Sequence, residues 1–328
     1  MPTNLPPECA EIDARYRAAT SPAEKIACLE ELLGTIPKHK GTDHLRADLR
    51  RRLARLRDEP GGRRSAARQA SAFRIEREGA GQVAVVGRPN VGKSALVAAL
   101  TNATPEVAEY PFSTWVPTPG MTLVDNVQIQ LIDTPPLDPT HLEPELIGLI
   151  RKADLILLMV DLQADPIGQL QDTLAMLATH HILPLSARAE CLDPSRQTFK
   201  PMLFVANKTD DEAVDEDFRA LCDLFEGECR FVPASAATGR GLGRLKQAIF
   251  DALGIIRVYT KPPGKGPDLT APFVLKVGST VGDLAGKIHK DFLDNLKSAR
   301  VWGQGVFEGQ LVGRDYVLCE GDIVELRA

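Results

Sequence analysis

The segment from Gly87 to Ser94, which reads Gly-Arg-Pro-Asn-Val-Gly-Lys-Ser, constrains the fold of this chain more than any other feature. An apolar run, Gln82 to Val86, precedes it, and the residues from Ser94 to Leu100 have helical character. Glycines in such a strand-to-helix loop let backbone N–H groups close around an anion at the positive end of the helix. The sequence therefore predicts a phosphate-binding loop in an α/β domain.

The residues of this loop have separate predicted roles. Lys93 is expected to contact β and γ phosphate oxygens and to be catalytic, and the Ser94 hydroxyl is expected to ligate Mg²⁺. The nucleotide-binding candidates in this segment are Gly87, Arg88, Pro89, Asn90, Val91, Gly92, Lys93, Ser94 and Ala95.

Two downstream segments add candidate metal ligands. Leu131 to Pro135 ends an apolar strand with Asp133, whose carboxylate is predicted to hold Mg²⁺ through water. Between this strand and the phosphate loop, Tyr110-Pro111-Phe112-Ser113-Thr114 supplies Thr114. We expect its hydroxyl and carbonyl to close over Mg²⁺ and the terminal phosphate, as a metal-binding and catalytic residue.

A base-reading motif, Asn207-Lys208-Thr209-Asp210, follows another apolar strand. Asp210 can accept from N1–H and from the exocyclic amine of guanine, a donor pair that adenine lacks. The Lys208 stem is expected to lie against the base, Asn207 to brace the loops, and Ser235-Ala236 to present a backbone N–H to guanine O6. The three motifs in this order predict a Ras-like G domain that binds GTP and GDP. ATPase activity would require that Asp210 does not read the base.

The wider pattern divides the chain into three regions. Residues 80–254 alternate apolar runs with helical segments, which predicts a mainly parallel sheet covered by helices, the Ras-like G domain. Residues 1–79 are predicted to form a helical hairpin with a basic linker. Residues 255–328 are predicted to form a β-grasp domain. Its expected elements are one helix at 281–293 and strands at 273–276, 299–302, 316–318 and 323–326.

The first region combines helical signals with basic charge. Ser21 to Glu24 forms a capping box, and we expect the helix that follows to stop at Gly34. Between Lys38 and Arg77 thirteen basic residues face five acidic ones, although the whole chain carries a net charge of −5. The run Arg50-Arg51-Arg52 is either a solvated helix face or a surface that contacts RNA.

Composition indicates the compartment. The six cysteines form no CxxC pair and share no spacing with histidines, which argues against a disulfide framework and a zinc site. No apolar run has the length of a membrane span, and Met1 to Glu8 lacks a signal-peptide core. We therefore expect a cytoplasmic protein without a membrane partner.

Several stretches outside the three motifs are similar to segments of a known protein family. They are Thr35 to Thr42, Tyr110 to Thr114, Ile256 to Pro262, Lys287 to Lys290 and Ala299 to Gly303. Together with the three motifs they resemble the developmentally regulated GTP-binding (DRG) branch of the Obg and DRG family of translation-factor GTPases, and the last three are similar to its TGS domain. The resemblance covers nearly the whole chain. It implies contact with the ribosome or ribosomal RNA through basic N-terminal helices and the TGS domain. An accessory protein is a further candidate partner.

The chain also departs from this family. Pro136 stands where the family has a glycine whose N–H meets the γ-phosphate, and proline has no N–H. Leu137 occupies the position of the water-orienting glutamine of Ras, as hydrophobic residues do in the Obg family. The segment from Gln163 to Lys200 is too short for the subdomain that DRG proteins insert there. Asn90 matches an asparagine that coordinates K⁺ in related GTPases, or it only stabilises its loop.

Two hypotheses of function follow. In the first, the protein hydrolyses GTP to GDP slowly with Mg²⁺, and with K⁺ if Asn90 binds it, and this reaction switches its association with a ribosome or RNA assembly. In the second, motivated by Pro136 and Leu137, it is a guanine-nucleotide-dependent binding module or scaffold with little hydrolysis.

Overall fold

The computed structural model describes residues 12, 15–16, 22–35, 49–52, 73–101, 116–138, 142–227 and 229–327. The chain divides into two compact units, Met1–Arg74 and Ile75–Ala328. None of the helices in the described part combines the length and apolar character that a bilayer span requires.

The first unit contains the helix α2, Pro22–Thr35, which packs Leu29 and Leu32 into a small apolar cluster. The expected stop at Gly34 is wrong by one residue, because Thr35 still belongs to the helix and its hydroxyl donates to the Glu31 carbonyl over 2.8 Å. Residues 49–52 are helical, with residues 50–52 exposed. The capping residue Ser21 and most of the basic linker lie outside the described residues.

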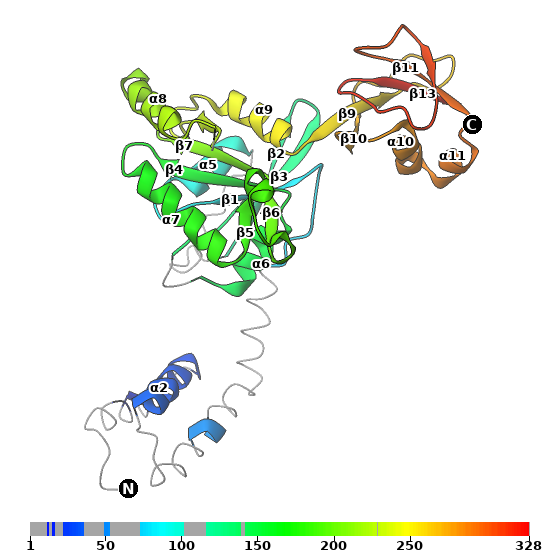
Figure 1. Ribbon diagram of the computed structural model, residues 1–328. Coiled ribbons are helices and arrows are strands. Elements are labelled where there is room, and N and C mark those ends of the chain that lie inside the picture. Colours follow the sequence, from blue (N-terminus) through cyan, green and yellow to red (C-terminus); the bar gives the residue numbers. More distant parts are fainter. Residues whose placement is uncertain are drawn as a thin grey trace. The chain divides into compact units, whose positions relative to one another are not determined.

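The second unit begins with a six-stranded sheet in the order β2-β3-β1-β4-β7-β8 (Figure 1). Only β2 runs antiparallel to its neighbour, and the other pairs in this sheet are parallel. The strands are β1 Gln82–Val86, β2 Thr118–Val124, β3 Val127–Asp133, β4 Leu155–Asp161, β7 Met202–Asn207 and β8 Phe231–Pro233. This arrangement confirms the predicted α/β G-domain fold, to which the structure adds the edge strand β2.

Helices cover both faces of this sheet. The central strand β4 is buried along its whole length, as expected for a parallel strand between two helical layers. Residues of α5 and α9 share one apolar core with alternate residues of β1, β4 and β7, and α7 packs against β4 (Figure 1). The helices of this region are α5 Lys93–Leu100, α6 Pro144–Lys152, α7 Pro166–Thr179, α8 Asp215–Leu224 and α9 Leu242–Ala252.

A short insertion separates α7 from β7. It contains a two-stranded parallel sheet, β5 Ile182–Pro184 and β6 Thr198–Lys200, with two short 3₁₀ helices between the strands. This compact element occupies the place where the resemblance implied a larger subdomain.

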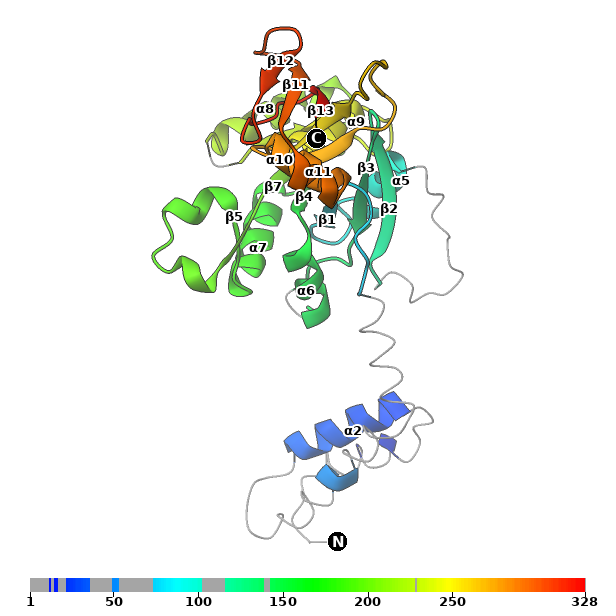
Figure 2. The same cartoon turned by 90° about the vertical axis from the view of Figure 1, so that its right-hand side faces the viewer.

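The C-terminal part forms a five-stranded mixed sheet in the order β10-β9-β13-β11-β12, with two helices (Figure 2). Its core joins Val258, Leu284, Val301 and Val324. The predicted β-grasp fold is confirmed. Its elements are β9 Ile255–Thr260, β10 Phe273–Lys276, α10 Val281–Ile288, α11 Lys290–Asn295, β11 Ser298–Trp302, β12 Gln310–Val312 and β13 Ile323–Arg327.

Two expectations for this domain are wrong. The helix predicted at 281–293 is broken at His289, whose backbone is extended (φ −166°), and the turn brings Leu293 against Gly286. Helical periodicity did not reveal this break because apolar residues continue at helical spacing through it, at positions 281, 284, 288 and 292. Residues 316–318 do not form a strand, and only Val317 makes an isolated bridge, to Thr280.

Arg257 joins the β2–β3 turn to the C-terminal domain. Its Nη1 donates to Asp125 Oδ2 over 2.6 Å, its Nε donates to Glu320 Oε1 over 2.5 Å, and its guanidinium lies 5.1 Å from the centre of the Phe250 ring. Beside it, the Asn126 amide donates to the Tyr259 hydroxyl over 3.2 Å. One cation therefore holds a turn of the sheet, the helix α9 and a C-terminal loop together.

We predict that Arg257→Ala lowers the free energy of unfolding by about 1–3 kcal/mol, because it leaves two carboxylates without their charged donor. Thermal unfolding of the full chain measures this effect. The matched control is Arg244→Ala, an exposed arginine on α9. Equal melting temperatures for the two variants would contradict a role of Arg257 in joining these elements.

Candidate functional site

The loop between β1 and α5 has a backbone that needs its glycines. Gly87 and Gly92 have φ values of 156° and 91°. A Cβ atom on Gly87 would lie 2.6 Å from the Met159 carbonyl oxygen, and one on Gly92 would lie 2.4 Å from Asn207 Nδ2. Such distances are far below van der Waals contact, so larger residues would push the loop away from β4 and β7.

Lys93 folds back over this loop. Its Nζ donates to the carbonyl oxygens of Gly87 over 3.1 Å and Arg88 over 3.0 Å. Burial lowers the pKa of Lys93 to about 8, and the nearby Asp133 carboxylate opposes that shift. The first turn of α5 has no side-chain cap, so its positive end suits an anion.

Asp133 ends β3 beside this loop. Its pKa is raised, chiefly by burial, while a hydrogen bond from Ser94 and the charge of Lys93 act in the opposite direction. Its Oδ1 is buried and has no hydrogen-bond partner. An orphaned carboxylate oxygen next to a hydroxyl is a fitting environment for a hard cation, so these residues suit Mg²⁺. The other expected ligand, Thr114, lies outside the described residues.

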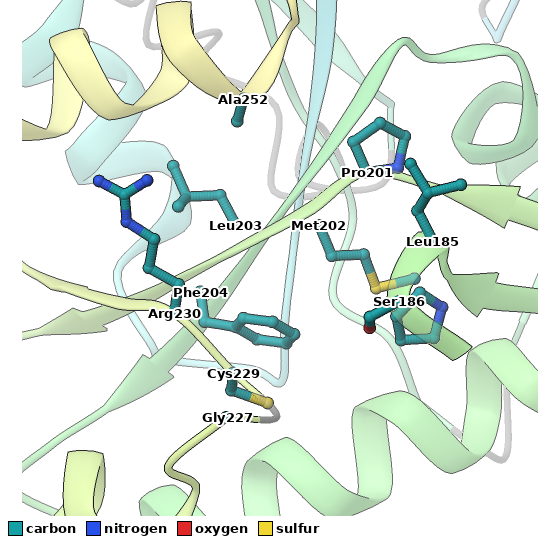
Figure 3. A pocket seen from close by; sticks show the side chains of 11 residues that line it. Leu185, Ser186, Pro201, Met202, Leu203, Phe204, Gly227, Cys229, Arg230 and Ala252 are labelled. Carbon is teal, nitrogen blue, oxygen red and sulfur yellow. The ribbon is translucent and has the colours of Figure 1, made fainter. Parts of the chain in front are cut away.

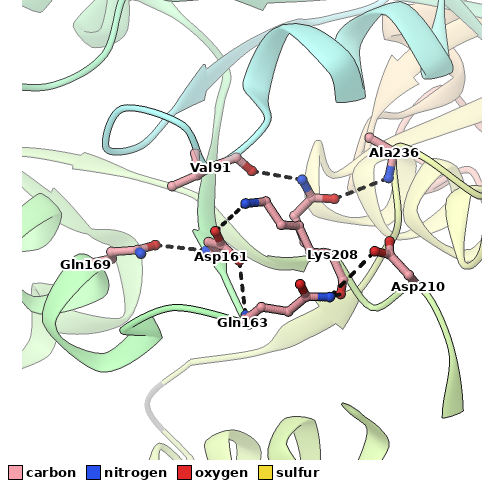
Figure 4. A network of polar contacts seen from close by, with 8 residues as sticks. Val91, Asp161, Gln163, Gln169, Lys208, Asp210 and Ala236 are labelled. Atoms are coloured by element: carbon pink, nitrogen blue, oxygen red, sulfur yellow. Dashed lines mark hydrogen bonds and ion pairs between the residues drawn. The ribbon is translucent and has the colours of Figure 1, made fainter. Parts of the chain in front are cut away.

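Asn207 connects the phosphate loop to the base-reading loops. Its Nδ2 donates to the Val91 carbonyl over 2.8 Å, and its Oδ1 accepts from the Ala236 backbone N–H over 3.2 Å (Figure 4). The Asn207 side chain is therefore in the bracing position that the sequence suggested, between the ends of β1, β7 and β8.

Ser235 orients the carboxylate of Asp210. Its hydroxyl donates to Asp210 Oδ1 over 2.6 Å, and the serine is fully buried. The pair Ser235-Ala236 was expected to present an N–H to guanine O6. Here the Ser235 N–H donates to the Arg240 carbonyl and that of Ala236 to Asn207, so this contact is not preformed.

Two residues of the site were missed from the sequence. Asp161 ends β4 in register with Asn207 of β7, and its carboxylate pairs with the Lys208 ammonium. Gln163 follows two positions later and donates to the Lys208 carbonyl over 2.9 Å. Their signal was a carboxylate at the last position of the most apolar strand and an amide two residues later, at the sheet edge where ligands bind.

The segment after Asp133 offers few backbone donors to a phosphate. Pro135 and Pro136 have no N–H, and the Leu137 N–H donates to the Gly87 carbonyl over 3.1 Å. The Leu137 side chain is completely buried. The three positions 135–137 therefore have no N–H group directed to a ligand.

A hollow of about 440 Å³ lies at the opposite end of the sheet (Figure 3). Met202, the first residue of β7, lines it together with Leu185 and Arg230. Nucleotides in such sheets bind at the carboxyl ends of the strands, so this hollow is separate from the site described above.

We predict that Asp210→Asn weakens GDP binding by about 100-fold or more, because an amide cannot accept both guanine donors. The same variant should bind xanthosine diphosphate more tightly, since xanthine has an acceptor in place of the amine. Displacement of a fluorescent nucleotide measures both affinities, with Asp211→Asn as the control at the next, exposed position. Unchanged GDP affinity in Asp210→Asn would contradict the assignment of the base site.

Comparisons with known proteins agree with this geometry. A family model described as 50S ribosome-binding GTPase matches residues 82–208, and the TGS domain model matches residues 256–328. An uncharacterized GTP-binding protein of Methanocaldococcus jannaschii is 30% identical, over 92% of each chain. The developmentally-regulated GTP-binding protein 1 of Xenopus laevis is 28% identical, and the ribosome-interacting GTPase 1 of Saccharomyces cerevisiae is 26% identical, each over 92% of this chain and 98% of its own. This chain therefore belongs to the DRG family of Obg-type GTP-binding proteins and carries a C-terminal TGS domain.

Proposed function

We propose that this protein hydrolyses GTP to GDP and phosphate at a slow intrinsic rate, and that the bound nucleotide switches its association with the ribosome or ribosomal RNA in the cytoplasm. The observation that carries the proposal is the Asn207 side chain, which bonds both the phosphate loop and the base-reading loop. A nucleotide bound to both loops would therefore couple them.

Lys93 has the central role in the proposed reaction. In the described conformation its ammonium is bonded to two loop carbonyls, and we expect it to turn to the β and γ phosphates when a nucleotide binds. Ser94, Asp133 and Thr114 would hold Mg²⁺, which supplies positive charge to the phosphate oxygens when bound. Asn90, exposed and with a φ of 65°, is the candidate ligand for K⁺.

Slow hydrolysis follows from the residues after Asp133. An aliphatic side chain at position 137 cannot polarise a water molecule, and this one is completely buried. The attacking water must therefore be oriented by Thr114, by K⁺, by backbone groups or by a partner.

The ribosome part of the proposal rests on charge and on relatives. The exposed run Arg50-Arg51-Arg52 suits a polyanion. A yeast relative is named as ribosome-interacting, and the family model for the G domain is described as ribosome-binding. The TGS domain and an accessory protein would add further contacts.

Sedimentation of the full chain with ribosomal particles, in GTP, GDP or a non-hydrolysable analogue, tests this association. We expect co-sedimentation that depends on the nucleotide and weakens steeply with salt. Replacing Arg50, Arg51 and Arg52 by glutamine should weaken it further, whereas the same change at the exposed Arg219 should not. Separate sedimentation under every nucleotide at low salt would refute the ribosome role.

The second candidate, a guanine-nucleotide-dependent binding module with little hydrolysis, is favoured by positions 135–137, where two prolines have no N–H and the Leu137 N–H is bonded to the Gly87 carbonyl. Single-turnover phosphate release in KCl and in NaCl separates the two candidates. Turnover stimulated by K⁺ and abolished by Lys93→Ala would exclude the binding module. No release above that of Lys93→Ala in either salt would exclude the enzyme.

Pro136→Gly tests whether the missing N–H at position 136 weakens recognition of the γ-phosphate. The glycine restores an N–H that can meet the γ-phosphate, so we expect the preference for GTP over GDP to rise by about 3- to 10-fold, the effect of one hydrogen bond. Pro135→Ala, at the neighbouring proline, is the control. An unchanged preference in Pro136→Gly would show that this position does not face the γ-phosphate.

A further inference from the structure

The end of β4 is bonded to the base-reading motif at several points (Figure 4). The Asp161 carboxylate pairs with the Lys208 ammonium through one oxygen and accepts from the Gln163 backbone N–H over 3.0 Å through the other. The Gln163 side chain reaches back and donates to the Lys208 carbonyl over 2.9 Å. Lys208 is thus held at both its side chain and its peptide group.

Lys208 needs such support because of its backbone. Its φ of 65° lies in the left-handed region, which is unfavourable for a residue with a side chain. The strained residue stands between Asn207, which braces the loops, and Asp210, the expected reader of guanine. A turn held in this conformation keeps both neighbours in place.

Gln163 also lies next to the Asp210 carboxylate. Its Nε2 is 3.5 Å from Asp210 Oδ2, while the Ser235 hydroxyl donates to Oδ1 on the other side. The carboxylate therefore has a donor beside each oxygen. Before any base is present, the serine already bonds one oxygen, and the glutamine amide lies at the outer limit of hydrogen-bond distance from the other.

The β4 end is itself anchored to the helix that follows. The Asp161 backbone N–H donates to Gln169 Oε1 over 2.8 Å, and Gln169 belongs to α7. Asp161 is buried whereas Gln163 is exposed. The buried residue thus supplies the anchor, and the exposed one extends to the edge of the base site.

We propose that Gln163, anchored by Asp161, is a positioning residue for guanine specificity that sets the orientation of the Asp210 carboxylate. This inference rests on the proposed recognition of guanine by Asp210. The amide has the right chemistry for the role, because its two N–H groups can serve the Lys208 carbonyl and the Asp210 carboxylate together. Orientation matters since guanine presents two donors that must meet two oxygens at once.

The test compares the affinities of GDP and of inosine diphosphate for the full chain. Hypoxanthine lacks the exocyclic amine, so it uses one carboxylate oxygen where guanine uses two. For Gln163→Ala we expect GDP affinity to fall by about 3- to 10-fold and inosine diphosphate affinity to fall less. The ratio of GDP affinity to inosine diphosphate affinity should therefore decrease. Gln171→Ala, the same truncation at an exposed position of α7, is the matched control and should leave both affinities unchanged.

A second variant tests whether the donor character of the Gln163 amide, and not only its size, matters for GDP affinity. Gln163→Glu keeps the size of the side chain but replaces the donor by a carboxylate, which would repel both Asp210 and the Lys208 carbonyl. We therefore expect a larger loss of GDP affinity than in Gln163→Ala. Equal losses for both nucleotides, or a milder effect of Gln163→Glu, would overturn the inference. If the wild-type chain bound GDP no better than ADP, the proposed guanine site would itself be wrong.

Discussion

The side-chain amide of Asn207 is the contact on which the site depends most. It bonds the phosphate loop through Val91 and the loop after β8 through Ala236. It also lies so close to Gly92 that only a glycine fits at that position. Three loops from three strand ends therefore share one buried group. Because the parallel sheet brings these strand ends to one edge, the fold places the three loops close together. The Asn207 amide then aligns the loops with one another.

The two halves of the site differ in how completely they are formed. On the base side Asp210 already has a donor beside each oxygen, and Lys208 is held at both ends. On the phosphate side Lys93 is bonded to loop carbonyls, and an oxygen of Asp133 has no partner. Before a nucleotide binds, the base side is therefore the more completely formed of the two.

Much of this could be predicted from the sequence, because glycine spacing and apolar runs carry local information. The phosphate loop, the Asp133 strand and the guanine motif were recognised in this way. Asp161 and Gln163 were not, since their role depends on β4 and β7 lying in register, which no local pattern encodes. The edge strand β2 was not predicted because Pro119 and Gly120 weaken its strand pattern. The break at His289 was not predicted because apolar residues keep helical spacing on both sides of it.

The contacts around Asp210 and Asn207 support guanine-nucleotide binding more strongly than the residues after Asp133 support hydrolysis. The most direct test is isothermal titration of nucleotide-free protein with GDP and with ADP, in the presence of Mg²⁺. The carboxylate geometry predicts that GDP binds roughly 1,000-fold more tightly than ADP. The reason is that guanine can form two charge-assisted hydrogen bonds with the Asp210 carboxylate that adenine cannot form. Comparable affinities for the two nucleotides would contradict the assignment of Asp210 and of the loops that Asn207 aligns.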